Sequence, residues 1–243
     1  MASILPLEFR EVGFSAGGQV LLRDLSIRFE AGSPSVVMGP NGAGKSLSLR
    51  IAHGLLAPTT GSVRWLGLDA PPNDPRVRHR QAMVFEQPVL LRRSAAANVD
   101  YALAVARVPR SERADRVAQA LSRTGLARVA DRRARVLSAG EQQRLSLARA
   151  WALEPEVLFL DEPTAALDPG ATRAVEESIT AISESGTKIV MTTHDLGQAR
   201  RLAGEILLLC QGRLVERAAA ADFFESPESA EARSFLNGDL LWQ

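Results

Sequence analysis

Apolar and polar residues alternate along residues 7–30, and the alternation is interrupted at Ala16-Gly17-Gly18. Strict alternation is typical of a half-buried strand, and paired glycines favour a tight turn, so we expect an antiparallel strand pair here. Short runs of apolar residues predict further, more deeply buried strands. Such runs occupy 36–38, 157–160 and 188–192. Residues 62–66 and 82–85 are also expected to form strands.

Helical patterns fill most of the remaining chain. Residues 89–153 are rich in Ala, Arg and Leu and contain no strong strand pattern, which predicts a block of helices. Further helices are expected over about 45–55, 170–185 and 219–236, and a hairpin over 206–216 with its turn at Gln211-Gly212. Strands that alternate with helices imply an α/β fold with a mainly parallel sheet covered on both faces. We predict one domain, in which 1–88 and 154–243 form the core and 89–153 is an inserted helical subdomain.

The composition narrows the possible functions. The chain has 243 residues, of which 46% are hydrophobic, and a formal net charge of +1. A net charge this close to zero gives the chain no overall positive potential, so we expect no nucleic-acid partner. A single cysteine, Cys210, excludes an internal disulfide and a cysteine metal cluster. Residues 1–30 lack the pattern of a signal peptide, and no apolar run is long enough to span a membrane, so membrane association is expected to need a partner.

Lysine is rare in this chain, since only Lys45 and Lys188 occur among 29 basic residues. Because a planar guanidinium cannot replace a compact ammonium where space is tight, Lys45 indicates a functional site. The string around it fits the phosphate-binding pattern G-x-x-x-x-G-K-[ST], between a predicted strand and a predicted helix. That string is Gly39-Pro40-Asn41-Gly42-Ala43-Gly44-Lys45-Ser46.

Such a loop curls so that several N–H groups point at phosphate oxygens, and the helix N-terminus adds a favourable dipole. Lys45 is expected to reach the β- and γ-phosphates of ATP, and the Ser46 hydroxyl to ligate Mg²⁺. An ordinary glycine-rich turn is the alternative, but it leaves the Lys, the Ser and both flanking elements unexplained.

Two carboxylates, Asp161 and Glu162, follow the apolar run 157–160. Ligands of open α/β sheets gather at the carboxyl ends of strands. Asp161 is therefore expected to hold Mg²⁺, directly or through water, and Glu162 to polarise the attacking water as general base. The alternative is that both acids cap the turn before Pro163.

A second helix start carries a recognisable string. Ser138 and Glu141 have the spacing of a capping box. The longer string, Leu-Ser-Ala-Gly-Glu-Gln-Gln-Arg-Leu, resembles the LSGGQ signature of ATP-binding cassette (ABC) ATPases. This resemblance covers about residues 7–216 and implies a P-loop NTPase core with a mainly parallel sheet, an N-terminal antiparallel β subdomain and an inserted α-helical subdomain.

The resemblance implies roles for further residues. Asp168 would sit at a dimer interface, and His194 would contact the γ-phosphate, with a buried core histidine as the alternative reading. Phe14 matches the aromatic residue that stacks on adenine, and a core position is its alternative. His53 and His79 gain no such support and are expected to be structural or solvated.

Two positions depart from the family pattern. Leu47 follows Ser46 in the nucleotide-binding loop, where many members have Thr, so one phosphate contact is lost. The glutamine that couples the helical lid to the core normally follows Phe85 directly, but that place holds Glu86, and Gln87 comes one residue late. Either residue could provide the Mg²⁺ ligand and catalytic group, and the unshifted spacing favours Glu86.

The resemblance also implies partners. Two ATPase subunits would form a homodimer in which Ser138 and Gly140 contact the ATP held by the partner's phosphate loop. The helical subdomain would receive integral membrane permease subunits at the cytoplasmic face of the membrane, where Arg92 and Arg93 could pair with permease acids or simply be solvated. A periplasmic or extracellular solute-binding protein would act indirectly.

The cargo is suggested only by local resemblance. Residues 87–94 and Ala97-Asn98-Val99 are similar to ATPases of tungstate importers, so we expect oxyanion import, with molybdate, phosphate or other small solutes as alternatives. An ABC ATPase of DNA maintenance is disfavoured because the chain has no coiled-coil insertion or basic stripe. The signature string and His194 disfavour a P-loop ATPase outside this family.

Overall fold

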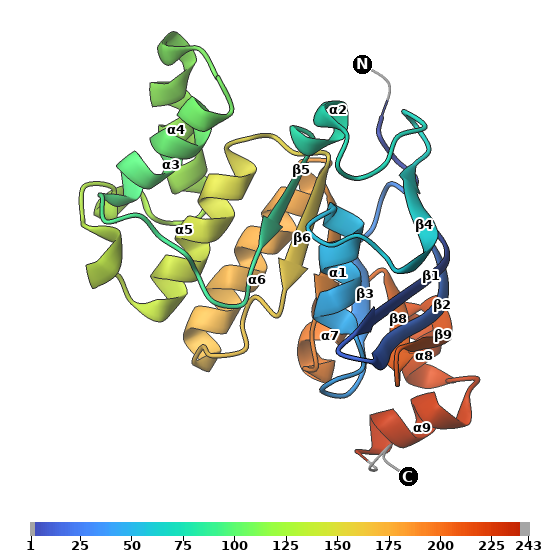
Figure 1. Ribbon diagram of the computed structural model, residues 1–243. Helices are drawn as coiled ribbons and strands as arrows, with labels where there is room; N and C mark the ends of the chain where they lie inside the picture. The colour runs from blue at the N-terminus through green and yellow to red at the C-terminus, as the bar shows by residue number, and fades with distance from the viewer. Residues whose placement is uncertain (1–2, 239–243) are drawn as a thin grey trace. The chain divides into compact units, whose positions relative to one another are not determined.

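The computed structural model describes residues 3–238, which fold into two compact units (Figure 1). The first unit combines the chain up to residue 78 with the chain from residue 188 onward, and the second comprises 79–187. Among residues 3–238, no helix has both the length and the apolar character that a membrane span needs.

An antiparallel sheet opens the first unit (Figure 1). Its strand order is β2-β1-β4, with β1 at Leu7–Ala16, β2 at Gln19–Phe29 and β4 at Thr60–Trp65. Gly17 and Gly18 connect β1 to β2 with positive φ angles of 58° and 78°. Two positive φ angles give a two-residue hairpin the twist of its strands. The predicted strand pair and its turn are confirmed.

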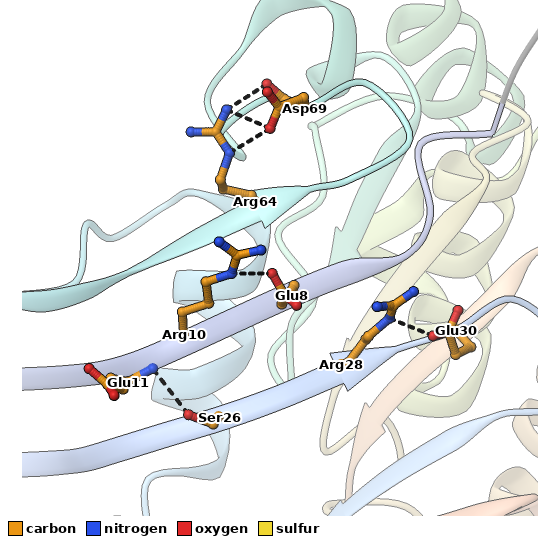
Figure 2. Close-up of polar contacts among 8 residues, drawn as sticks. All are labelled: Glu8, Arg10, Glu11, Ser26, Arg28, Glu30, Arg64 and Asp69. Carbon is orange, nitrogen blue, oxygen red and sulfur yellow. Dashed lines mark hydrogen bonds and ion pairs between the residues drawn. The ribbon is translucent and has the colours of Figure 1, made fainter.

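Several ion pairs lie on this antiparallel sheet and beside it (Figure 2). Arg64 pairs with Asp69 at 2.8 Å. Arg28 pairs with Glu30 at 2.6 Å, and Arg10 forms an ion pair with Glu8 on the same strand. Exposed ion pairs contribute little to stability, so burial of the apolar side chains holds this sheet in place.

The second sheet of this unit contains β7 (Lys188–Thr192), β3 (Ser35–Met38), β8 (Glu205–Cys210) and β9 (Arg213–Ala219) in that order. β3 pairs in parallel with β7 and β8, whereas β9 returns antiparallel to β8. Every residue of β3 and β7 is buried, as continuous apolar runs predict. The helices of the unit are α1 (Lys45–His53), α2 (Pro75–Arg78), α7 (Leu196–Leu202), α8 (Ala220–Glu225) and α9 (Ala230–Asn237).

The C-terminal segment corrects one prediction. Residues 219–236 are largely helical as expected, but they form two helices, α8 and α9, with a break between them. The break falls at Ser226, whose φ of −145° is not helical and which precedes Pro227. A proline pushes the preceding residue out of the α region, so the helix ends there.

The second unit combines two parallel strands with a group of helices. β5 (Gln81–Val84) pairs in parallel with β6 (Val157–Asp161). Three helices, α3 (Ala95–Val105), α4 (Arg110–Arg123) and α5 (Ala139–Trp151), share a core that includes Leu103, Leu121 and Leu145. α6 (Pro169–Glu184) packs against α5, and short 3₁₀ turns occur at η1 (Ala127–Val129) and η2 (Ala134–Val136). The predicted α/β fold is confirmed.

Candidate functional site

The phosphate loop connects β3 to α1 and depends on glycine. Gly39 and Gly44 have φ angles of 141° and 97°, which side-chain-bearing residues rarely adopt. A Cβ on Gly39 would lie 2.0 Å from the carbonyl oxygen of Leu209, and one on Gly44 would lie 2.4 Å from Cδ2 of Leu22. Neighbouring strands thus pack closely against both glycines, and a side chain at either position would clash as well as strain the backbone.

The start of α1 is suited to an anion. Gly44 occupies the N-cap position and has no side chain with which to accept a helix N–H. The first turn, from Lys45 to Ser48, contains no acidic residue. An N-terminus without a capping side chain or a nearby carboxylate presents N–H groups and a positive dipole to a bound phosphate.

The Lys45 side chain lies inside the loop. It is only 6% exposed, and its Nζ donates to the carbonyl oxygens of Gly39 at 2.8 Å and Pro40 at 3.2 Å. An ammonium forms a stronger hydrogen bond with an anionic phosphate oxygen than with a neutral carbonyl, so phosphate could replace these two acceptors. The structure therefore places the Lys45 ammonium within the glycine loop, and its contact with phosphate stays a prediction.

Two other residues of the first unit belong to the predicted site. His194 follows β7 and is exposed, so it is not a buried core histidine. The loop after it is fixed by Asp195, whose side chain caps α7 by accepting the backbone N–H of Gln198 at 2.9 Å. Phe14 is half-buried in β1 and retains ring surface that a base could cover.

The remaining histidines lie outside the phosphate loop. His53 ends α1, where burial and, secondarily, the positive charge of Arg78 lower its pKa from 6.5 to about 4. It is therefore neutral at pH 7 and structural. His79 is exposed.

The predicted acids occupy the end of β6 in the second unit. Asp161 is the last strand residue and is only 3% exposed. Glu162 follows with a φ of 46°, a strained value for a residue with a side chain. Such strain costs on the order of 1–3 kcal/mol and concentrates at functional sites.

The oxygen donors predicted for a metal suit Mg²⁺. Carboxylate, hydroxyl and amide oxygens are the hard ligands that this ion prefers, and Asp161, Ser46, Glu86 and Gln87 supply them. Within residues 3–238, no three His, Cys, Asp or Glu side chains gather into a metal cage.

The capping box at α5 forms as its spacing predicts. Ser138 Oγ accepts the backbone N–H of Glu141 at 3.3 Å, and the Glu141 carboxylate accepts the backbone N–H of Ser138 at 2.8 Å. Ser138 is exposed at the positive end of the helix. Gly140 is buried, and a Cβ there would lie 2.6 Å from Cβ of Ala171, so this glycine also permits α5 to approach α6.

Asp168 has a local role that the resemblance did not supply. Its Oδ1 accepts the backbone N–H groups of Gly170 at 2.9 Å and Ala171 at 3.0 Å, which caps α6. The sequence carried this signal, because Asp followed by Pro at the start of a helical pattern is a typical helix N-terminus.

Glu86 and Gln87 follow β5, and both are exposed. The preceding residue, Phe85, accepts a hydrogen bond on its carbonyl oxygen from Nε2 of Gln143 on α5, at 3.4 Å. Gln87 lines a groove on the second unit, whereas Glu86 does not. The two neighbouring residues therefore face different surroundings.

The chain has clear relatives among known proteins. It matches the family model for "ABC transporter" over residues 22–165. A phosphate import ATP-binding protein of Natronomonas pharaonis is 35% identical, over 93% of this chain and 84% of that protein. A methionine import ATP-binding protein of Nocardia farcinica is 38% identical, over 98% and 74%.

A third relative and one solved structure complete the comparison. The ATP-binding protein of a tungstate uptake system in Peptoclostridium acidaminophilum is 36% identical, over 83% of this chain and 93% of that protein. The structure of cbiO1 from Clostridium perfringens, part of the ABC transporter complex cbiONQ, superimposes with a TM-score of 0.84 at 25% identity, over 93% of this chain and 92% of that one.

Proposed function

Because this chain belongs to the ABC transporter family, as the ATP-hydrolysing subunit of a small-solute importer, we propose that it works as a homodimer bound to a membrane permease. The glycine loop that encloses Lys45 supports the ATP-binding part of this proposal, since its curled backbone and buried ammonium suit phosphate oxygens. Operation beside a permease would place the subunit at the cytoplasmic face of the membrane, with a solute-binding protein acting indirectly.

The roles of the site residues follow from the chemistry of phosphoryl transfer. The oxygen of a water molecule attacks the γ-phosphorus, the bond from that phosphorus to the β–γ bridging oxygen breaks, and ADP and phosphate leave. Glu162 accepts the proton of the water, while Lys45 and His194 stabilise charge on the phosphate oxygens. Ser46 and Asp161 would hold Mg²⁺, which would supply positive charge at those oxygens.

The second copy completes the site in this proposal. Ser138 is exposed at a helix N-terminus, where both its hydroxyl and the dipole favour an anion. Its capping box is already formed within the subunit, so the contact requires no rearrangement of the helix start. Ser138 and Gly140 therefore suit the γ-phosphate of an ATP held by the partner.

The second unit carries a groove that suits a permease helix. The groove has a volume of about 310 Å³, and its lining includes Met83, Val84, Gln87, Pro88, Ala102 and Ala150. This largely apolar surface fits the apolar face of a short helix. The proposed coupling helix of the permease would lie here and transmit closure of the ATPase dimer.

The cargo proposal is an oxyanion, with tungstate first. The tungstate relative supports it, together with the resemblance over residues 87–94. Phosphate and methionine import are the alternatives, since those relatives are similar to the same degree. Cells that lack this gene should lose uptake of one solute, and complementation with wild type but not with Lys45→Ala should restore it. Loss of methionine uptake with intact tungstate uptake would reject the oxyanion.

Glu162→Gln tests the proposed reaction and dimer together. Removal of the proton acceptor should leave ATP binding intact and reduce turnover at least a hundredfold, so that an ATP-bound dimer accumulates. Size-exclusion chromatography with ATP and Mg²⁺ measures the dimer, and a malachite green assay measures released phosphate. Persistence of the monomer at high protein concentration, also with permease present, would contradict the proposed homodimer.

A further inference from the structure

The near-neutral net charge of the chain hides a strong local asymmetry. Residues 89–137 contain eleven arginines and four acidic residues, which gives this stretch a formal net charge of +7. Since the whole chain has a net charge of +1, all other residues together carry −6. Concentrated like charge raises the electrostatic energy of the free subunit and is useful where an anionic partner binds.

Five of these arginines lie on two segments that the fold places side by side. We call Arg92, Arg93, Arg132, Arg133 and Arg135 the arginine cluster. The backbone N–H of Ala95 donates to the carbonyl oxygen of Arg132 at 2.9 Å, and that of Ala134 donates to the carbonyl oxygen of Arg93 at 2.9 Å. Ser94 and Arg133 form an antiparallel bridge. The cluster is thus built from residues about forty positions apart in the chain.

A buried amide holds the first of these segments rigid. Asn98 is completely buried, and its Oδ1 accepts the backbone N–H of Leu91 at 2.8 Å. Its Nδ2 donates to the carbonyl oxygens of Leu91 at 3.2 Å and Ser94 at 2.9 Å. A fully satisfied buried amide specifies one conformation, so the arginines are presented on a fixed surface.

The charges of the cluster are not neutralised within the subunit. Across residues 3–238, the structure shows no ion pair for Arg92, Arg132, Arg133 or Arg135, and all four are exposed. Arg93 lies over the ring of Tyr101, with its Cζ 5.3 Å from the ring centre. The first turn of α3, which starts between the two segments, contains no acidic residue and adds its positive dipole.

The cluster continues the groove proposed for the permease. Pro88 and Val89 line that groove, and Arg92 and Arg93 follow them in the chain after only two intervening residues. Val89 and Val136 are 77% and 70% exposed, so apolar surface borders the arginines at the end of each segment. An occupant of this surface would need carboxylates beside apolar side chains.

We propose that an acidic segment of the permease, adjoining the helix in the groove, docks on the arginine cluster. This inference rests on the function proposed above, because it requires the ATPase to bind a permease. The apolar groove beside the cluster favours a protein segment over a lipid headgroup, because a headgroup would leave that apolar surface uncovered. The cluster then determines which permease this ATPase accepts, because an uncharged or basic segment would leave its arginines facing no counter-charge.

A labelled amphipathic peptide with glutamates along one face and leucines along the other tests this surface. Its matched control has glutamine in place of every glutamate. The full-length protein should bind the acidic peptide, with an affinity that falls as salt rises. It should bind the glutamine peptide about tenfold less tightly. Arg132→Gln/Arg133→Gln/Arg135→Gln should cause a similar loss of about tenfold in affinity, measured by fluorescence anisotropy.

The matched control variant is Arg23→Gln/Arg78→Gln/Arg213→Gln, which removes three exposed arginines from the other unit. It should bind the acidic peptide as wild type does. Equal loss in both variants, or equal binding of both peptides, would overturn the proposal. Tighter binding to vesicles of phosphatidylglycerol than to the peptide, abolished by the cluster variant, would overturn it in favour of a lipid surface.

Two further measurements keep the interpretation clear. Thermal unfolding should show that the cluster variant is as stable as wild type, and Arg92→Gln/Arg93→Gln provides a second variant if it is not. ATP turnover of the same wild-type sample separates the two proposals. Turnover without peptide binding would reject only the acidic segment, whereas absence of turnover would reject the proposed function itself.

Discussion

α1 and α5 begin in opposite ways, although the same kind of ligand is proposed for both helix starts. α1 begins behind Gly44, which has a positive φ and no side chain, so its N-terminal groups depend on other acceptors. α5 begins behind Ser138, whose side chain and that of Glu141 satisfy each other's backbone donors. The first start is shaped for a ligand, and the second is stable before any ligand arrives.

The difference follows from what each start must do. The α1 loop is proposed to surround the phosphates of ATP, so its backbone must approach them closely, and a capping side chain would occupy the space of the ligand. The α5 start is proposed to meet an ATP that another subunit holds. It must therefore be preorganised in the free subunit, and a capping box worth about 1 kcal/mol provides this.

The largest effect should come from the charge inside the α1 loop. Lys45→Ala removes the ammonium and should reduce ATP turnover by about 10²–10³-fold, on the order of 3–4 kcal/mol of transition-state stabilisation. Lys45→Arg keeps the charge but should also fail, because the enclosed site fits a compact ammonium. Steady-state phosphate release measures both. Turnover within twofold of wild type in Lys45→Ala would remove this residue from the reaction.

The C-terminal end of α1 contains His53, which should make the stability of the protein depend on pH. The folded-state pKa of His53 is about 4, below its ordinary value of 6.5, because burial disfavours the charged ring. At pH 5 the unfolded chain therefore binds a proton that the folded chain does not. Stability should fall as the pH drops from about 6.5 to 4, by up to about 3 kcal/mol from this residue.

His53→Gln tests that dependence. Urea unfolding of wild type and variant at several pH values isolates the contribution of His53 from that of the carboxylates. The stability gap between the two proteins should narrow or reverse as the pH falls, since only the wild type has the buried imidazole. A gap that stays constant from pH 7 to 4 would show that His53 takes up its proton in the folded state.

Sequence patterns predicted the parts of this fold whose signal is local. The buried strands β3, β6 and β7 are continuous apolar runs, and the hairpin of β1 and β2 combines alternation with two glycines. α2 and α7 were missed because one or two helical turns are too short for their periodicity to show. The split between α8 and α9 depended on Pro227, a signal that was present and overlooked.

In the candidate site, too, features with a local sequence signal were predicted and features that depend on distant contacts were not. The loop from Gly39 to Ser46 carries its chemistry in adjacent residues, so its position before a helix followed from the sequence. The packing of Gly140 against Ala171 joins two helices and has no local signature. The arginine cluster likewise depends on the pairing of two distant segments, which single-sequence patterns cannot reveal.

A smaller effect should come from the α5 start. Ser138→Ala removes one half of the capping box and should lower stability by about 1 kcal/mol, whereas Ser138→Asn, another good capping residue, should restore most of it. ATP binding to the same subunit should remain unchanged in both variants, because the proposed ligand belongs to the partner copy. Differential scanning fluorimetry and a nucleotide-binding titration measure the two quantities. Loss of ATP binding in the monomer would place Ser138 in its own subunit's site.

The smallest effect concerns Glu86 and Gln87. Replacing Glu86 with glutamine would show which of the two residues acts in catalysis. Gln87 lines the groove proposed for the permease, while Glu86 does not, so the two residues face different surroundings. The unshifted spacing after Phe85 keeps Glu86 as the residue proposed to face the nucleotide. A glutamate keeps an oxygen for Mg²⁺ but cannot donate to the attacking water, and its charge repels the triphosphate. Glu86→Gln should therefore raise turnover several-fold, an effect of about 1 kcal/mol, and Gln87→Ala should leave basal turnover within twofold. If Gln87→Ala abolishes turnover and Glu86→Gln changes nothing, the loop is shifted by one residue and Gln87 takes the catalytic place.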